Sequence, residues 1–302
     1  MSLKMAKNPI LAPTLINKLG VLFISLIIMI WITGVFQYIL GYVGLGTRNA
    51  FLISSTFQSC FAFIFPSWLA ARLCYGDVSE YVGISCKTSG RQYIGVLVLY
   101  ILLFPFINSI VDWNAGLHLP EAASGLEEVI RSMEDQAARI TEMILADTSV
   151  WGLISGILII GCLTGFSEEM FFRGGLQRAI VTSGVNKHLA VWISAFIFSA
   201  VHFQFFGFVP RMLLGALFGY LYLYTGSIWI SAFAHALNNS VVVMSSWLAN
   251  RGIIGFDLDS IGVAEQGFPV AATISVILSV LFIITVGKKI FKPANNGTAE
   301  RS

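Results

Sequence analysis

Long apolar runs separated by short polar segments dominate the chain between residues 20 and 286. Most of these runs reach the ~20 mostly apolar residues that a helix needs to cross a membrane. The run 211–225 is short and continues through Thr-Gly-Ser into the next run, which predicts a tight helical hairpin. We therefore predict eight transmembrane helices, at 20–40, 50–71, 93–111, 150–178, 189–207, 211–225, 228–249 and 269–286.

The segment 112–149 interrupts this pattern and is predicted to lie outside the membrane as an amphipathic helix. Ser124 would be its N-cap and Glu127 the capping-box partner. Seven acids and two arginines fall between Glu121 and Asp147, so the helix is acidic. We expect it to lie on the membrane surface or on the bundle, with a lid or partner-binding role as the alternative. Its apolar side chains recur at helical spacing on one face: Leu126, Ile130, Met133, Ala137, Ile140 and Ile144.

The amino-acid composition also indicates a membrane protein. Of the 302 residues, 56% are hydrophobic and 11% charged, whereas a soluble protein carries roughly 25% charged residues. The fold class is therefore an all-α integral membrane protein, a single membrane domain over residues 1–302. Net charge is only +2, which offers no broad basic surface for nucleic acid. Residues 290–302 are predicted to be a disordered cytoplasmic tail.

The distribution of lysine and arginine predicts the orientation. With eight spans, 12 of the 18 basic residues fall on the side of both termini and five on the other, with Arg211 among the five and Arg173 inside a span. Because cytoplasmic loops carry the excess of Lys and Arg, the N- and C-termini are predicted to be cytoplasmic. We expect a multi-pass protein of the cell (inner) membrane.

Polar side chains nevertheless occur inside the proposed spans. A charged residue at the centre of a span costs about 2.5–3.5 kcal/mol on insertion scales. An intramembrane ionisable residue is therefore a candidate functional residue, and here six polar residues gather in three spans. They are Glu168, Glu169, Arg173, His202, His235 and Asn239.

Spacing separates these residues into roles. Glu169 and Arg173 stand four apart and would form a pair on one helical face. Glu168 is rotated about 100° from Glu169 and remains the carboxylate free for chemistry. His235 and Asn239 also stand four apart. At about 1.5 Å per residue, Glu168, both histidines and Asn239 could meet near one depth, provided that the fourth helix continues through the glycines at 174 and 175.

This set of residues can support hydrolysis. A carboxylate with a nearby histidine can take a proton from water, and a histidine and an asparagine amide can donate to an oxyanion. Two histidines and a glutamate could also hold zinc. A proton-coupled transporter is a third reading, since buried Glu and His can relay protons.

Three motifs occur in order along successive spans. "EEMFFR" (168–173) has the form EExxxR, "FSAVH" (198–202) the form FxxxH, and "HALNN" (235–239) the form HxxxN. In this order they resemble the CPBP intramembrane proteases, also called the Abi family, which includes CaaX prenyl endopeptidases and proteins linked to bacteriocin processing and immunity. The similar region is about residues 150–245, within a catalytic core of about 150–250.

The resemblance implies an intramembrane endopeptidase with a peptide or membrane-protein substrate. It implies that Glu168 and His202 activate water and that His235 and Asn239 form the oxyanion hole. Glu169, Arg173 and Phe198 would then be supporting residues. No cofactor is expected, with zinc as the runner-up, and the alternative is a non-proteolytic bacteriocin-immunity or membrane binding protein on the same fold.

Overall fold

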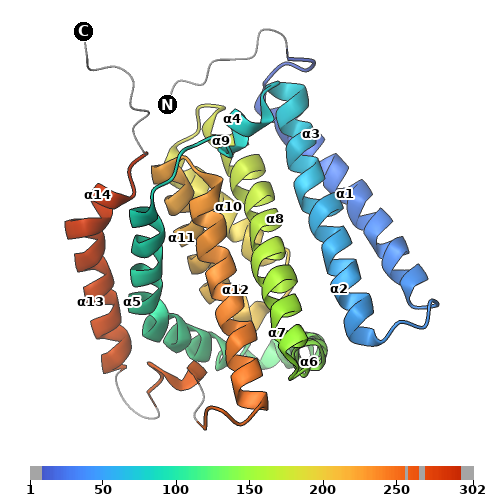
Figure 1. Cartoon of the computed structure of the whole chain (residues 1–302), viewed down its shortest axis with the longest axis vertical. Coiled ribbons are helices and arrows are strands. Elements are labelled where there is room, and N and C mark those ends of the chain that lie inside the picture. The colour runs from blue at the N-terminus through green and yellow to red at the C-terminus, as the bar shows by residue number, and fades with distance from the viewer. Residues whose placement is uncertain (1–8, 256–257, 265–268, 294–302) are drawn as a thin grey trace.

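The computed structural model describes residues 9–255, 258–264 and 269–293, and within these ranges every regular element is a helix. Figure 1 shows the helices packed side by side as one bundle, with α6 at the end opposite α4, α9 and α14. The first half comprises α1 (Leu15–Leu40), α2 (Thr47–Gln58), η1 (Ser59–Ile64), α3 (Phe65–Cys74), α4 (Val78–Val82), α5 (Gly90–Ala115), η2 (Glu121–Ala123) and α6 (Ser124–Leu145).

The second half contains all the candidate site residues. It comprises α7 (Val150–Gly156), η3 (Ile157–Thr164), α8 (Gly165–Glu169), η4 (Met170–Gln177), α9 (Arg178–Val181), α10 (Lys187–Ala200), η5 (Phe205–Gly207), α11 (Phe208–Thr225), α12 (Ile228–Asn250), η6 (Leu258–Ser260), α13 (Val270–Phe282), η7 (Ile283–Gly287) and α14 (Lys288–Ile290).

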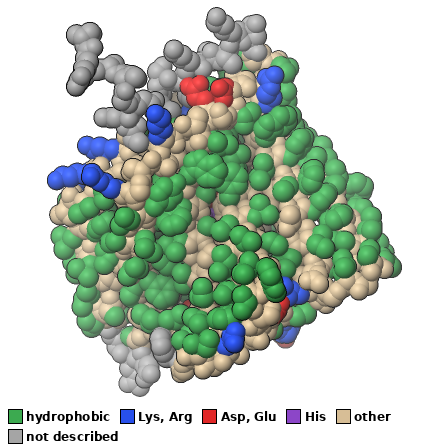
Figure 2. Space-filling view, viewed as in Figure 1, with side chains coloured by type: hydrophobic (Ala, Val, Ile, Leu, Met, Phe, Trp, Pro, Cys, Tyr) green, Lys and Arg blue, Asp and Glu red, His purple; other side chains and the backbone are tan. Residues whose placement is uncertain are grey.

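The predicted all-helical membrane architecture is confirmed. Seven helices of the described residues are long and apolar enough to cross a membrane, and α10 is a shorter apolar helix. Large apolar side chains lie exposed on the outer faces, among them Trp31 at 72% and Ile28 at 50%. Figure 2 shows apolar side chains over the middle of one face and most of its charged ones toward the two ends. Such a surface is stable when lipid covers it.

The predicted span 189–207 is wrong in its second half. The helix α10 ends at Ala200, and Phe203 in the following turn has a φ of 53°. The turn begins where the His202 ring donates from Nδ1 to the carbonyl oxygen of Phe198, 2.7 Å away. A continuing helix would have used that carbonyl for the backbone N–H of residue 202, so the side chain terminates the helix.

The fourth predicted span runs without a break from Val150 to Val181, through α7, η3, α8, η4 and α9. Two of its segments, η3 and η4, are π-helical. A Cβ at Gly174 would lie 3.0 Å from Val82, and one at Gly175 would lie 3.0 Å from Leu22. The glycines therefore continue the helix, as predicted, and allow it to pack closely against α4 and α1.

The helices that carry the candidate residues are central. In Figure 1, α8, α10, α11 and α12 lie between the pair α1 and α2–α3 on one side and the pair α5 and α13 on the other. Phe171, Phe172 and Phe198 belong to one buried cluster that joins α10 to the fourth span. Phe218, Ile230 and Ala234 belong to a second, which joins α11 and α12 to α5. The site is thus built on packed elements.

The acidic helix α6 forms as predicted, but its predicted N-terminal cap is wrong. A 3-10 turn precedes it, Ala123 occupies the N-cap position, and no side chain caps it. Glu127 instead accepts from the backbone N–H of Leu119 and pairs with Arg131 at 2.8 Å. These contacts lower the pKa of Glu127 to about 2. Their stabilisation is present above the ordinary pKa and is lost only as pH falls through about 2.

The apolar stripe of α6 is mostly exposed, with only Ile144 buried against the bundle. Near its middle, Glu134 accepts from the backbone N–H of Phe206, 2.9 Å away. The helix is therefore fastened to the turn between α10 and α11, across the end of the bundle. Its exposed apolar face is the one that a membrane surface would cover.

The chain end differs in part from the predicted tail. Phe291 is buried against α5, and the carbonyl of Lys292 accepts from Gln92, 2.8 Å away. The packed structure therefore extends past residue 290, and residues 294–302 of the predicted tail lie outside the described residues. The N-terminal residues 1–8, which include two lysines of the orientation argument, also lie outside them.

A tight turn holds the α11–α12 hairpin against the end of α4. Gly226 ends α11 in the left-handed conformation and α12 begins at Ile228. The Gly83 carbonyl accepts from the backbone N–H of Ile228, and Tyr222 donates to the Val82 carbonyl, 3.2 Å away. Gly83 has a φ of 83°, and a Cβ there would lie 2.4 Å from the Gly226 carbonyl oxygen.

Substituting Gly83→Ala should therefore lower the melting temperature of the detergent-solubilised protein by at least about 3 °C. The left-handed conformation alone costs an alanine about 1–2 kcal/mol, and the contact with Gly226 adds to it. Gly34→Ala is the control, because a Cβ at Gly34 in α1 meets no atom within 4 Å. Equal melting temperatures for the two variants would contradict this account.

Candidate active site

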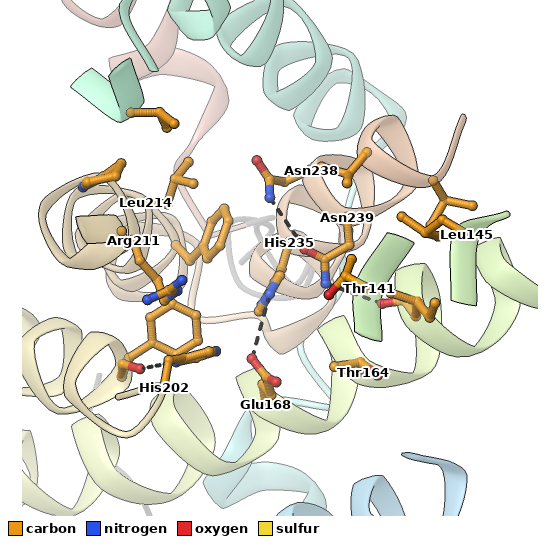
Figure 3. Close-up of a pocket in the computed structure, with 18 of the residues that line it drawn as sticks. Thr141, Leu145, Thr164, Glu168, His202, Arg211, Leu214, His235, Asn238 and Asn239 are labelled. Carbon is orange, nitrogen blue, oxygen red and sulfur yellow. Dashed lines mark hydrogen bonds and ion pairs between the residues drawn. The ribbon is translucent and has the colours of Figure 1, made fainter. Parts of the chain in front are cut away.

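The candidate residues surround one cavity of about 470 Å³. This volume is within the range of small-molecule and substrate sites. Most of its wall is apolar and comes from α11, α12, η3 and the end of α6. Its polar lining residues include the four candidates Glu168, His202, His235 and Asn239, and Figure 3 shows them around the same space. The structure thus brings together four residues that lie up to 71 positions apart in sequence.

A fully buried ion pair lies behind this cavity. Arg173 donates from Nη1 to Glu169 Oε1, 2.6 Å away, and both side chains are 0% exposed. The second nitrogen, Nη2, donates to the carbonyl of Gly215 in α11, 2.7 Å away. The pairing predicted from the four-residue spacing therefore forms, and it also ties the fourth span to α11.

His235 joins the same carboxylate. Its Nδ1 lies 2.9 Å from Glu169 Oε1, the oxygen that also accepts from Arg173. A carboxylate beside an arginine is ionised and only accepts, so the hydrogen must be on His235 Nδ1. The other ring nitrogen, Nε2, is then left to face the cavity. The spacing analysis had given Glu169 to Arg173 alone; its hydrogen bond to His235, which was not predicted, orients a candidate catalytic ring.

Glu168 points to the cavity and away from Arg173. Its Oε2 lies 3.7 Å from His235 Nε2, and its side chain is 12% exposed. The 100° offset from Glu169 therefore separates the two carboxylates as predicted. One is buried and fully neutralised by a permanent cation, whereas the other can reach a molecule in the cavity.

His202 reaches the cavity from the turn after α10. Because its Nδ1 donates to the Phe198 carbonyl, a neutral ring has its lone pair on Nε2. Among the described residues, no hydrogen bond or ion pair joins His202 to Glu168, and both line the cavity. The space between them is suited to a small polar molecule that both could contact.

Asn239 is oriented by two neighbours. Its Nδ2 donates to the carbonyl of Ile160, 3.2 Å away, and its Oδ1 accepts from Asn238 at 3.3 Å. Ile160 lies in the π-helical segment η3, where i→i+5 bonding alters which carbonyls are free. One N–H of the Asn239 amide remains for a ligand in the cavity.

Aromatic rings fix the two histidines. Phe198 meets His202 and His235 edge-on, at centroid distances of 5.2 and 5.6 Å. Phe218 stacks on His235 at 4.9 Å. The guanidinium of Arg173 lies 4.9 Å from the Phe198 ring centroid, which adds a cation–π contact. Phe198 therefore packs against three of the polar side chains and excludes water behind them.

The described side chains form no ready-made zinc ligand set. Within the described residues, no group of three or more His, Cys, Asp or Glu side chains is arranged to hold a metal ion. Both histidines keep Nε2 free of hydrogen bonds to other described residues, because their Nδ1 atoms donate to Glu169 and to the Phe198 carbonyl. The chemistry proposed below uses protein side chains and water.

Arg211 also lines the cavity, and the sequence analysis had missed it by counting it as an outer loop residue. It lies in the first turn of α11, and Figure 3 shows it on the same side of the cavity as His202. One signal could have found it: no acidic residue lies within four positions on either side in sequence. An arginine in an apolar helix without a local partner is a candidate functional residue.

Comparison with known proteins identifies the region that carries the site. Residues 150–241 match the model of the family described as type II CAAX prenyl endopeptidase Rce1-like. This agrees with the resemblance to CPBP proteases inferred from the three motifs. The matched range includes all six polar residues of the three motifs.

Over 92 residues the chain is 30% identical to "Uncharacterized protein YpbD" of Bacillus subtilis (strain 168). This alignment covers 29% of the chain and 44% of that protein, so the chain spans less than half the length of this relative. No solved structure matches the chain.

Replacing Arg173 by methionine should destabilise the protein by about 3–5 kcal/mol, because Glu169 would remain buried without its cation. Adding Glu169→Gln to Arg173→Met should recover part of this loss, since the uncompensated charge is then removed. Arg139→Met, at an exposed position on α6, should change stability by no more than about 0.5 kcal/mol. Denaturant melts of the four proteins in one detergent would measure these differences. A mild effect of Arg173→Met would contradict the importance of the ion pair.

Proposed function

We propose that this multi-pass membrane protein is an intramembrane endopeptidase that hydrolyses a peptide bond with water activated by Glu168 and His202. The observation that carries the proposal is that Glu168, His202, His235 and Asn239 line one cavity. The match of residues 150–241 to a CAAX-type endopeptidase family supports the reaction class.

In the proposed reaction a water molecule is held between the Glu168 carboxylate and His202 Nε2. Glu168 takes a proton as the water oxygen attacks the carbonyl carbon of the scissile bond. The proton is then delivered to the leaving nitrogen, the C–N bond breaks, and a carboxylic acid and an amine are released. No covalent intermediate with the protein is required.

His235 and Asn239 would stabilise the oxyanion. Asn239 has one amide N–H available after its bond to Ile160. His235 can donate from Nε2 only as an imidazolium, because its Nδ1 hydrogen is used by Glu169. Donors fixed in place before the reaction are the most effective form of such stabilisation.

The orientation follows from charge. The excess of lysine and arginine on the side of the termini favours a cytoplasmic location for both ends, in the cell (inner) membrane. The cavity then lies toward the outer side, beneath α6, and a peptide or membrane-protein substrate would reach it from there.

The first experiment compares protein termini in cells that produce the wild-type protein and in cells that produce Glu168→Gln at equal abundance. New termini seen only with the wild type would establish proteolysis and identify substrates. If the two cell populations have the same termini, and Glu168→Gln still rescues the phenotype of a deletion, the protein acts by binding and not by hydrolysis.

Purified variants test the individual roles. Glu168→Gln and His202→Ala should abolish cleavage in protein that remains folded. Asn239→Ala should lower the rate by roughly 10²–10³-fold, the usual effect of removing an oxyanion donor. Glu128→Gln, at an exposed position on α6, is the matched control and should cleave normally. Wild-type rates in Glu168→Gln would disprove the assignment.

A further inference from the structure

Arg211 presents a cation to the cavity without an anionic partner. Its Nη2 donates to the Gln204 side-chain oxygen. Its Nη1 is buried and has no hydrogen-bond partner within the described part of the chain. No Asp or Glu of the described residues forms an ion pair with it, whereas the buried Arg173 is paired with Glu169.

Two carboxylates, Glu168 and Glu134, interact with Arg211 electrostatically, but both also have partners elsewhere. Glu168 lines the same cavity but has its Oε2 toward His235 Nε2. Glu134, on α6, accepts from the backbone N–H of Phe206. The guanidinium therefore has a buried Nη1 without a partner, in a side chain that lines the space where a substrate would lie. Such a group gains most from an anion, because a charge-assisted pair is roughly twice as strong as a neutral hydrogen bond.

The local structure holds the guanidinium in place. Gly207 lies in the turn before α11, and a Cβ added there would come within 3.1 Å of Arg211 Nη2. Because residue 207 has no side chain, the Arg211 guanidinium can lie close to the backbone there. With Gln204 on the same nitrogen, the side chain is held from two sides and Nη1 is left without a partner among the described residues.

Resting on the proposed function, we propose that Arg211 binds a carboxylate of the peptide substrate and so sets where the chain is cut. A guanidinium matches a carboxylate in geometry and charge. The cavity of about 470 Å³ holds only a short length of peptide, so the carboxylate lies within a few residues of the scissile bond.

The surroundings favour a peptide carboxylate over a free anion. A neighbouring hollow of about 900 Å³ shares Thr141, Leu145, Gly207 and Val242 with the cavity and is also lined by the acids Glu134, Asp135 and Glu142. These acids repel small anions. A peptide overcomes this repulsion because its apolar residues fill the apolar wall of the cavity.

Two chemical sources provide such a carboxylate: the C-terminal α-carboxylate of the substrate, or an Asp or Glu side chain. The test uses the purified full chain and a randomised library of peptides of about ten residues, half ending in a free carboxylate and half in a carboxamide. Mass spectrometry reads which peptides are cut and where. A preference for free-carboxylate peptides cut near the end assigns the α-carboxylate, and Asp or Glu at a fixed distance from the cut in both halves assigns the side chain.

In either case the wild type should cleave peptides that carry the recognised carboxylate about 10–100-fold faster than peptides that lack it. This is the usual range for a hydrogen bond to a charged group. Arg211→Gln should remove that preference and leave slower cleavage that still depends on Glu168. Arg211→Lys should keep part of it. Arg251→Gln, at the exposed end of α12, is the matched control and should keep all of it.

Gly207→Ala provides a second variant, since it retains the charge but displaces the guanidinium, and it should also weaken the preference. Cleavage that depends on Glu168 but shows no carboxylate preference would overturn this inference alone, as would a preference that persists in Arg211→Gln. Absence of any cleavage that depends on Glu168 would overturn the proposed function and this inference together.

Discussion

A buried carboxylate oxygen, Glu169 Oε1, lies at the centre of the contacts that join three of the helices around the site. It accepts from Arg173 on its own helix and from His235 on α12, and Arg173 in turn donates to the Gly215 carbonyl on α11. Burying these charges is costly unless each is paired and hydrogen-bonded. The requirement for pairing fixes how α8, α11 and α12 lie relative to one another, and it fixes the orientation of the His235 ring.

The same pairing places two adjacent carboxylates in different environments. Glu169 is held by a permanent cation, whereas Glu168, one residue earlier, turns toward the cavity and has its Oε2 3.7 Å from His235 Nε2. Consecutive residues on a helix point about 100° apart, so a pair of neighbouring glutamates places one in the packed interior and one at the cavity. The proposed reactive group is therefore supported by a neighbour that does not itself face the cavity.

Departures from regular helix supply the remaining geometry. The end of α10 at Ala200 lets His202 approach from a turn, where its ring bonds to Phe198. The π-helical segment η3 offers the Ile160 carbonyl to Asn239. Single π-helical turns often occur at functional sites because they redirect backbone groups. Across the same end of the bundle, α6 is fastened by Glu134 to the turn that carries Phe206, which brings an acidic helix to the edge of the cavity.

The sequence alone determined the class, the helices and much of the site. Apolar run length predicts a spanning helix because lipid requires every backbone group to be bonded within the segment. The four-residue spacing of Glu169 and Arg173 predicts their pairing because helix geometry is local. The three motifs, in order, predicted which polar residues share a cavity.

The tertiary structure decided what depends on contacts between distant segments. The bond between His235 and Glu169 joins residues 66 positions apart, and no local rule predicts which ring nitrogen it occupies. The early end of α10 and the loss of the predicted Ser124 cap follow from side-chain bonds that helix periodicity does not predict, those of His202 to the Phe198 carbonyl and of Glu127 to Leu119 and Arg131. The inward position of Arg211 depends on how α11 packs beside the other walls of the cavity, which come from segments far apart in sequence.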